Sequence, residues 1–137
     1  MATAFEPQDA LIAVMVAVSA ADQRMTDRET ASILSIIDLL PVFQNYDRSR
    51  IDRVTSTVAD LFEREDGLDE LTGMVRAGLP PHLVETAYAL ACDVVAADGR
   101  AGESELQLLQ ILRDELDLDR LTTAAIERGA RARHQRL

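Results

Sequence analysis

The fold is decided by residues 82–116, which read HLVETAYALACDVVAADGRAGESELQLLQILRDEL. Residues 81–97 are apolar on nearly all sides, as expected of a helix in the middle of a fold. A tight turn follows at Asp98-Gly99, because glycine accepts positive φ and aspartate can bond nearby backbone amides. Residues 103–116 then place leucines on one helical stripe, at Leu106, Leu109, Leu112 and Leu116. The stretch predicts a helical hairpin made of a buried helix, an acidic turn and an amphipathic helix.

This hairpin pattern occurs twice in the chain. A shift of 76 positions aligns Ala20-Ala21-Asp22-Gln23-Arg24 with Ala96-Ala97-Asp98-Gly99-Arg100. The apolar helix at 8–21 then falls on 81–97, and the helix at 27–40 falls on 103–116. We therefore predict an internal repeat, with one copy at about 8–40 and the second at about 82–116. Two such hairpins can pack their buried helices together about a pseudo-twofold axis, with their acidic turns in related positions.

The remaining segments are also helical. Residues 47–65 show clear amphipathic spacing, and a short helix at 68–77 ends before Gly78 and two prolines, so linking helices span about 47–78. Pro41 ends the helix before them. A last helix covers about 118–133. No segment alternates at period two, and the length suits one domain, so we predict a single all-α bundle of about seven helices over residues 1–137.

Charge limits the classes of partner. The net charge is −10, which argues against a general nucleic-acid binder, because phosphate contacts need a basic face. Residues 120–137 nevertheless hold five arginines and one glutamate, for a net +4. This basic end could dock a protein partner, or its cations could only complement the dipole of the last helix. All 14 basic residues are arginine, which we interpret as the composition bias of a GC-rich bacterial genome.

Composition also limits location and chemistry. The longest apolar run, residues 10–21, is too short to span a bilayer, and the segment before it lacks the basic start of a signal peptide. We therefore predict a cytoplasmic protein without direct membrane insertion. Cys92 is the single cysteine and is expected to be a buried, inert thiol. His82 and His134 lack the spacing of metal ligands, and His82 is expected at the surface near a helix start.

The acidic turns allow two interpretations. The sequence Thr26-Asp27-Arg28-Glu29 fits a capping box, and Glu105 occupies the position of Glu29 in the second copy, so these acids can simply cap helices. Their oxygens also suit a hard divalent cation, Ca²⁺ or Mg²⁺, and Asp93 could join them. The second interpretation requires both turns to converge. The candidate metal ligands are Asp22, Asp27, Glu29, Asp98, Glu103 and Glu105.

At these residues the chain resembles the TerB-like family of tellurite-resistance proteins. The resemblance rests on Ala96-Ala97-Asp98-Gly99-Arg100 followed by Glu105, on its weaker copy around Asp22 and Glu29, and on the helical pattern of nearly the whole chain. Similar domains also stand at the start of a membrane-anchored J-domain co-chaperone. The resemblance implies a seven-helix bundle with internal pseudo-symmetry, a role in stress responses to tellurite, and acidic residues of the motif as a suspected metal site. Gln23 departs from the glycine of the motif.

These observations predict a non-enzymatic interaction or sensing module with a protein partner, regulated by a divalent cation at the acidic turns. The alternative is a purely structural interaction domain whose acids only cap helices. A metal-dependent hydrolase using the same acids is a third hypothesis, but helix starts explain their spacing better, and the sequence contains no nucleophile, P-loop or dinucleotide motif. A homodimer formed through helical faces is compatible with each hypothesis.

Overall fold

The computed structural model describes residues 5–21, 25–97, 99 and 101–137 of the chain. Seven α-helices lie in this part: α1 (Pro7–Ser19), α2 (Asp27–Leu39), α3 (Ile51–Phe62), α4 (Gly67–Gly78), α5 (Val84–Ala97), α6 (Glu103–Glu115) and α7 (Arg120–Arg133). Three short 3-10 turns join them: η1 (Pro41–Phe43), η2 (Arg48–Arg50) and η3 (Pro81–Leu83). The described residues contain no strand, and the predicted all-α bundle is confirmed.

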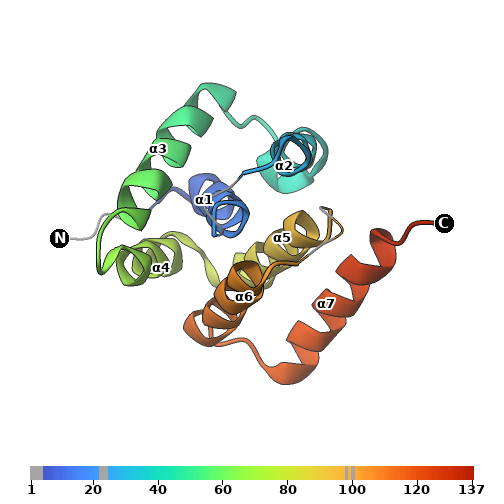
Figure 1. The fold of residues 1–137 in the computed structure, drawn as a ribbon. Coiled ribbons are helices and arrows are strands. Elements are labelled where there is room, and N and C mark those ends of the chain that lie inside the picture. The colour runs from blue at the N-terminus through green and yellow to red at the C-terminus, as the bar shows by residue number, and fades with distance from the viewer. Residues whose placement is uncertain (1–4, 22–24, 98, 100) are drawn as a thin grey trace.

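The two helices predicted to be buried form the centre of the bundle. All of α1 from Asp9 to Ser19 is buried, and α5 buries half of its residues, including Tyr88 and Val94 with no exposed surface. The contact between α1 and α5 is the most extensive between any two helices, as the sequence predicted. A helix without a polar face can be stable in water only when neighbours cover every side. The other helices therefore surround this pair (Figure 1).

The outer helix of each hairpin covers the central helix of the other hairpin as well as its own. Besides its own partner α1, α2 packs against α5, and α6 packs against α1 as well as α5. The α3–α4 pair covers another side of α1, and α7 packs along α5 (Figure 1). The two hairpins thus share one aliphatic core. That a twofold axis relates them stays a prediction.

Three helices start later than the sequence pattern indicated, and the smallest difference is at α7, which starts at Arg120 instead of about 118. The segment predicted as helix from residue 47 begins with η2, because the Asp47 carboxylate accepts hydrogen bonds from the amide (3.0 Å) and hydroxyl (2.6 Å) of Ser49. The regular helix α3 starts only at Ile51. Likewise, Pro81 opens the 3-10 turn η3, so α5 starts at Val84 instead of 81. Pro41 follows the end of α2, as predicted.

A buried carboxylate ties the start of α1 to the segment before α3. The Asp9 side chain accepts hydrogen bonds from the Tyr46 hydroxyl (2.8 Å) and from Nε of Arg50 (3.1 Å), and Nη2 of Arg50 completes a two-pronged ion pair. Burial, and then the bond to Asp9, raise the pKa of Tyr46, so this phenol stays a donor at any physiological pH. Asp9 can therefore be buried because its charge is paired and hydrogen-bonded.

Candidate functional site

The acids at the start of α2 form a complete capping box. Thr26 Oγ1 accepts a hydrogen bond from the Glu29 amide (3.1 Å), and Glu29 Oε1 accepts one from the Thr26 amide (3.2 Å). The Thr26 hydroxyl also donates to Glu29 Oε1 (3.0 Å). Asp27 is exposed in the same turn, where a negative charge is favourable near the helix N-terminus. The capping interpretation of Thr26 and Glu29 is thus confirmed.

The start of α6 has half of the same arrangement. The Gly102 amide donates to Glu105 Oε1 (3.2 Å), but Gly102 has no side chain to return a bond, as the sequence indicated. Glu105 is buried like Glu29, while Glu103 is exposed like Asp27. In both hairpins, therefore, one carboxylate of the first turn is buried and another faces solvent.

Capping accounts for only one oxygen of Glu29. The side chain is 2% exposed, and within the described part of the chain its Oε2 atom has no hydrogen-bond partner. An unsatisfied buried oxygen of an ionised carboxylate is costly, and a bound cation is one way to remove that cost. Capping and cation binding are compatible at Glu29, because they use different oxygens.

The predicted metal site extends outside the described residues. Asp22 and Asp98, which it needs, lie outside them. Within residues 5–21, 25–97, 99 and 101–137, no three side chains of Asp, Glu, His or Cys are grouped so that they could hold a metal ion. The described acids alone do not form a site, and the complete set of six stays a prediction.

The chain brings the entrance of the first turn next to the start of α6. Ala20 and Ala21, which lead into that turn, line a hollow of about 350 Å³ together with Ser104 and Gln107 of α6. Residues separated by more than 80 positions in the sequence thus border one space. This placement is what the cation site requires of the residues that flank the two turns.

Asp93 is paired with the end of α7 within the described residues. Its Oδ1 atom lies 2.6 Å from Nη2 of Arg133 and 3.5 Å from Nε2 of His134, both at the end of α7. That Asp93 contributes to the cation site stays a prediction, because Asp22 and Asp98 lie outside the described residues. Its position on α5 turns it toward α7, a neighbour that the sequence pattern did not specify.

The sequence profile of a family described as "Tellurite resistance protein TerB" matches residues 8–128. The chain belongs to the TerB family. The match includes both acidic turns and runs from the second residue of α1 into α7. No curated protein and no solved structure gives a significant match. The resemblance seen in the repeated acidic motif is confirmed by this match.

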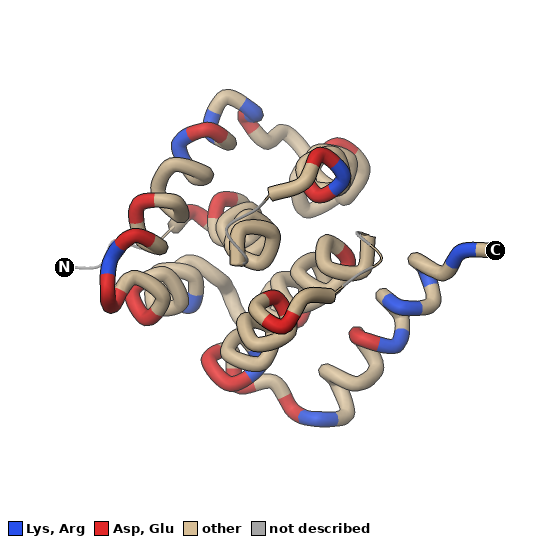
Figure 2. Tube along the Cα trace, in the orientation of Figure 1, with Lys and Arg blue, Asp and Glu red and all other residues tan. Residues whose placement is uncertain are grey.

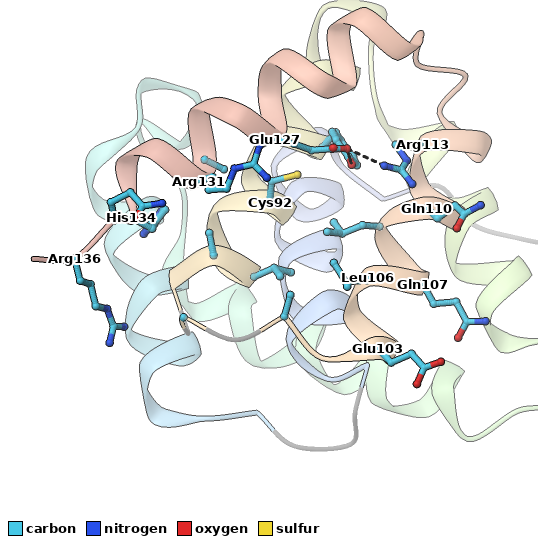
Figure 3. A pocket seen from close by; sticks show the side chains of 18 residues that line it. Cys92, Glu103, Leu106, Gln107, Gln110, Arg113, Glu127, Arg131, His134 and Arg136 are labelled. Atoms are coloured by element: carbon cyan, nitrogen blue, oxygen red, sulfur yellow. Dashed lines mark hydrogen bonds and ion pairs between the residues drawn. The ribbon is translucent and has the colours of Figure 1, made fainter.

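This TerB-family chain also has a large groove that the sequence did not predict. The groove has a volume of about 940 Å³ and lies between α6 and α7, with α5 as its floor (Figure 3). We call it the α6–α7 groove. Tyr88, Cys92 and Val95 contribute to it from α5. The one sequence signal that could have indicated it was the basic character of residues 120–137.

A polar cluster closes one end of the groove. The Tyr88 hydroxyl donates to Glu127 Oε2 (2.5 Å), and Nη1 of Arg113 donates to the same oxygen (2.8 Å; Figure 3). Burial, and then the bond to Glu127, raise the pKa of Tyr88 and keep it protonated. The cluster joins α5, α6 and α7, because each contributes one of its three side chains.

Cys92 of this groove is expected to react slowly with alkylating reagents. It is 5% exposed, and burial raises the pKa of its thiol to about 11. Since the thiolate is the nucleophile, a raised pKa lowers the reactive fraction at neutral pH. The rate of iodoacetamide labelling, followed by mass spectrometry, should therefore rise through pH 9 and 10 without a plateau. Labelling as fast as that of glutathione at pH 7.5 would contradict the buried position of Cys92.

Proposed function

We propose that this TerB-family protein is a non-enzymatic interaction module of the tellurite and stress response, regulated by a divalent cation that binds between its two acidic turns. The proposal places it in the cytoplasm. The observation that carries the cation site is Glu29, whose buried Oε2 atom has no partner within the described residues. The hollow shared by Ala20, Ala21 and Ser104 supports the convergence of the two turns.

Ca²⁺ or Mg²⁺ is the class of cation that this donor set favours. All six candidate ligands, Asp22, Asp27, Glu29, Asp98, Glu103 and Glu105, offer carboxylate oxygens, which hard cations prefer. Binding would neutralise part of the acidic charge and join the two hairpins. Such a link gives a cation a way to change the stability of the bundle and, through it, the affinity for a protein partner.

The capping bonds favour a second candidate, a purely structural interaction domain without a metal. Glu29 Oε1 and Glu105 Oε1 already serve the starts of α2 and α6. If that were their whole role, the domain would bind its partner without responding to any cation. The two candidates differ in one measurable property, the affinity of the isolated protein for divalent ions.

Calorimetric titration of the full chain with Ca²⁺, Mg²⁺, Mn²⁺ and Zn²⁺ tests the proposal. We expect binding heat with Ca²⁺ or Mg²⁺ and a higher melting temperature. A cation at a hundred times its Kd should add about 2.7 kcal/mol to the free energy of unfolding. Asp22→Asn, Asp98→Asn and Glu29→Gln should each abolish the heat. Glu29→Gln is informative because glutamine can keep the capping bonds while it removes the charge.

Asp52→Asn is the matched control, since Asp52 is an exposed carboxylate near the start of α3, outside the acidic turns. It should leave both the heat and the cation-induced shift in melting temperature unchanged. Absence of heat and of any shift with all four ions would establish the structural alternative. Heat that survives Asp22→Asn and Asp98→Asn would place the ion elsewhere.

A further inference from the structure

The α6–α7 groove exists because α7 packs on α5 and has little contact with α6. Figure 1 shows α6 and α7 on one side of α5, with α7 diverging from α6 along its length. Both wall helices are long, with 13 residues in α6 and 14 in α7. At about 1.5 Å per residue, these walls are about 20 Å long, the length of a helix of three to four turns.

Apolar side chains of all three helices line the groove. Val95, Leu109 and Ala130, each almost fully buried, line it from three different helices. Leu106 stands in the centre of the view in Figure 3 and is 52% exposed. A half-exposed leucine beside an apolar floor gains free energy when another apolar side chain covers it. The groove is therefore suited to an apolar stripe.

Two arginines, Arg131 on α7 and Arg136 in the segment that follows it, add positive charge to the groove. Arg131 and Arg136 line the groove and are exposed, and within the described residues neither forms an ion pair. By contrast, Arg113 and Arg133 are paired, with Glu127 and Asp93 respectively. Figure 2 shows how basic positions gather along α7 in a chain that is otherwise rich in acids.

The opposite wall is mostly neutral. It presents Gln107 and Gln110, whose amides can donate and accept, and Glu103 stands at one end (Figure 3). An occupant therefore meets one guanidinium group on α7, another just beyond the end of α7, and amides along α6. Charge complementarity across an interface of this kind selects an acidic partner and raises its association rate.

We propose that the α6–α7 groove binds an acidic amphipathic helix of another protein. An apolar stripe of such a helix would cover Leu106 and the floor, and its acidic side would face Arg131 and Arg136. This mode of recognition, a helix laid in an apolar groove, is common among interaction modules. The inference rests on the proposed interaction role but not on the proposed cation site.

A second copy of the chain is a poorer fit than another protein. The large apolar side chains exposed in the described residues lie singly on different elements: Met25, Leu39, Leu106, Leu121 and Leu137. The other apolar side chains of the described helices are largely used in the core. No described helix therefore has a free apolar stripe to insert into the groove of a neighbour.

Selection from a displayed library of 16-residue helical peptides, against the full chain in metal-free buffer, tests the inference. Enriched peptides should carry apolar residues at i, i+3 or i+4 and i+7, flanked by aspartate or glutamate. The Kd of a fluorescein-labelled enriched peptide, measured by anisotropy, should rise about tenfold or more in Leu106→Glu and in Arg131→Glu. Added salt should weaken binding to the unmodified protein more than binding to Arg131→Glu.

Leu39→Glu and Arg53→Glu are matched controls, because both residues are exposed and lie outside the groove, on α2 and α3. They should leave the Kd unchanged, and the melting temperature of each variant shows that it is folded.

An empty selection, or enriched peptides that are basic, would overturn the inference. If acidic peptides bind Leu106→Glu as tightly as the unmodified protein, the groove is not their binding site, although the proposed interaction role would remain. A dimer in sedimentation equilibrium that Leu106→Glu dissociates would identify a second copy as the occupant and also overturn the inference.

Discussion

Gly67→Ala is expected to lower the free energy of unfolding by about 3 kcal/mol or more, the largest effect of any single added methyl group. A Cβ atom at Gly67 would lie 1.5 Å from the backbone oxygen of Leu61, far inside van der Waals contact. A side chain cannot relieve this overlap by changing its rotamer, because the obstacle is backbone. The tight turn between α3 and α4 would have to open, and with it the cover that these helices provide for α1. Urea denaturation followed by circular dichroism measures the loss.

Gly73→Ala is the matched control in the same helix. A Cβ at Gly73 would meet no atom within 4 Å, and the residue is exposed in the middle of α4. Alanine restricts the unfolded chain and favours helix, so this variant should gain about 0.5–1 kcal/mol. Equal stability of the two variants would show that the α3–α4 turn is less tight than the structure indicates.

Apolar periodicity was sufficient to predict the helices and the centre of the fold. The segments around Val14 and Val94 are apolar on nearly all sides, and such segments are stable only between other helices. Proline and the capping pattern at Thr26 predicted the end and the start of α2 in the right place. Proline and capping residues act on backbone within one helical turn of themselves, so the local sequence is sufficient to predict their effect.

The site was predictable only in part, because it depends on how helices are placed relative to one another. The capping role of Glu29 follows from local spacing and is confirmed. That Asp93 faces Arg133 depends on the packing of α7 against α5, across 40 positions of sequence. The α6–α7 groove likewise results from the divergence of two helices, for which periodicity gives no signal. The basic residues at the end of the chain indicated the charge of the groove but not its existence or its shape.

The second large effect is expected at Tyr88, the largest side chain without exposed surface. Its ring lies where α5 meets α7, and its hydroxyl reaches Glu127 of α7. Two interactions therefore hold α7 at this point, the packing of the ring and the hydrogen bond. Phenylalanine removes only the second, and alanine removes both, so the pair of variants separates them.

Tyr88→Ala should lower the free energy of unfolding by about 3–5 kcal/mol, because it leaves a cavity the size of an aromatic ring. Tyr88→Phe should lose only about 1 kcal/mol, since Glu127 keeps its ion pair with Arg113 and stays partly exposed to water. Urea denaturation gives both values, and amide exchange should show faster opening of α7 in Tyr88→Ala. An alanine variant as stable as the phenylalanine variant would mean that the ring does not hold α7.

Because α7 forms one wall of the α6–α7 groove, Tyr88→Ala should also weaken binding of an acidic helical peptide, whereas Tyr88→Phe should retain it.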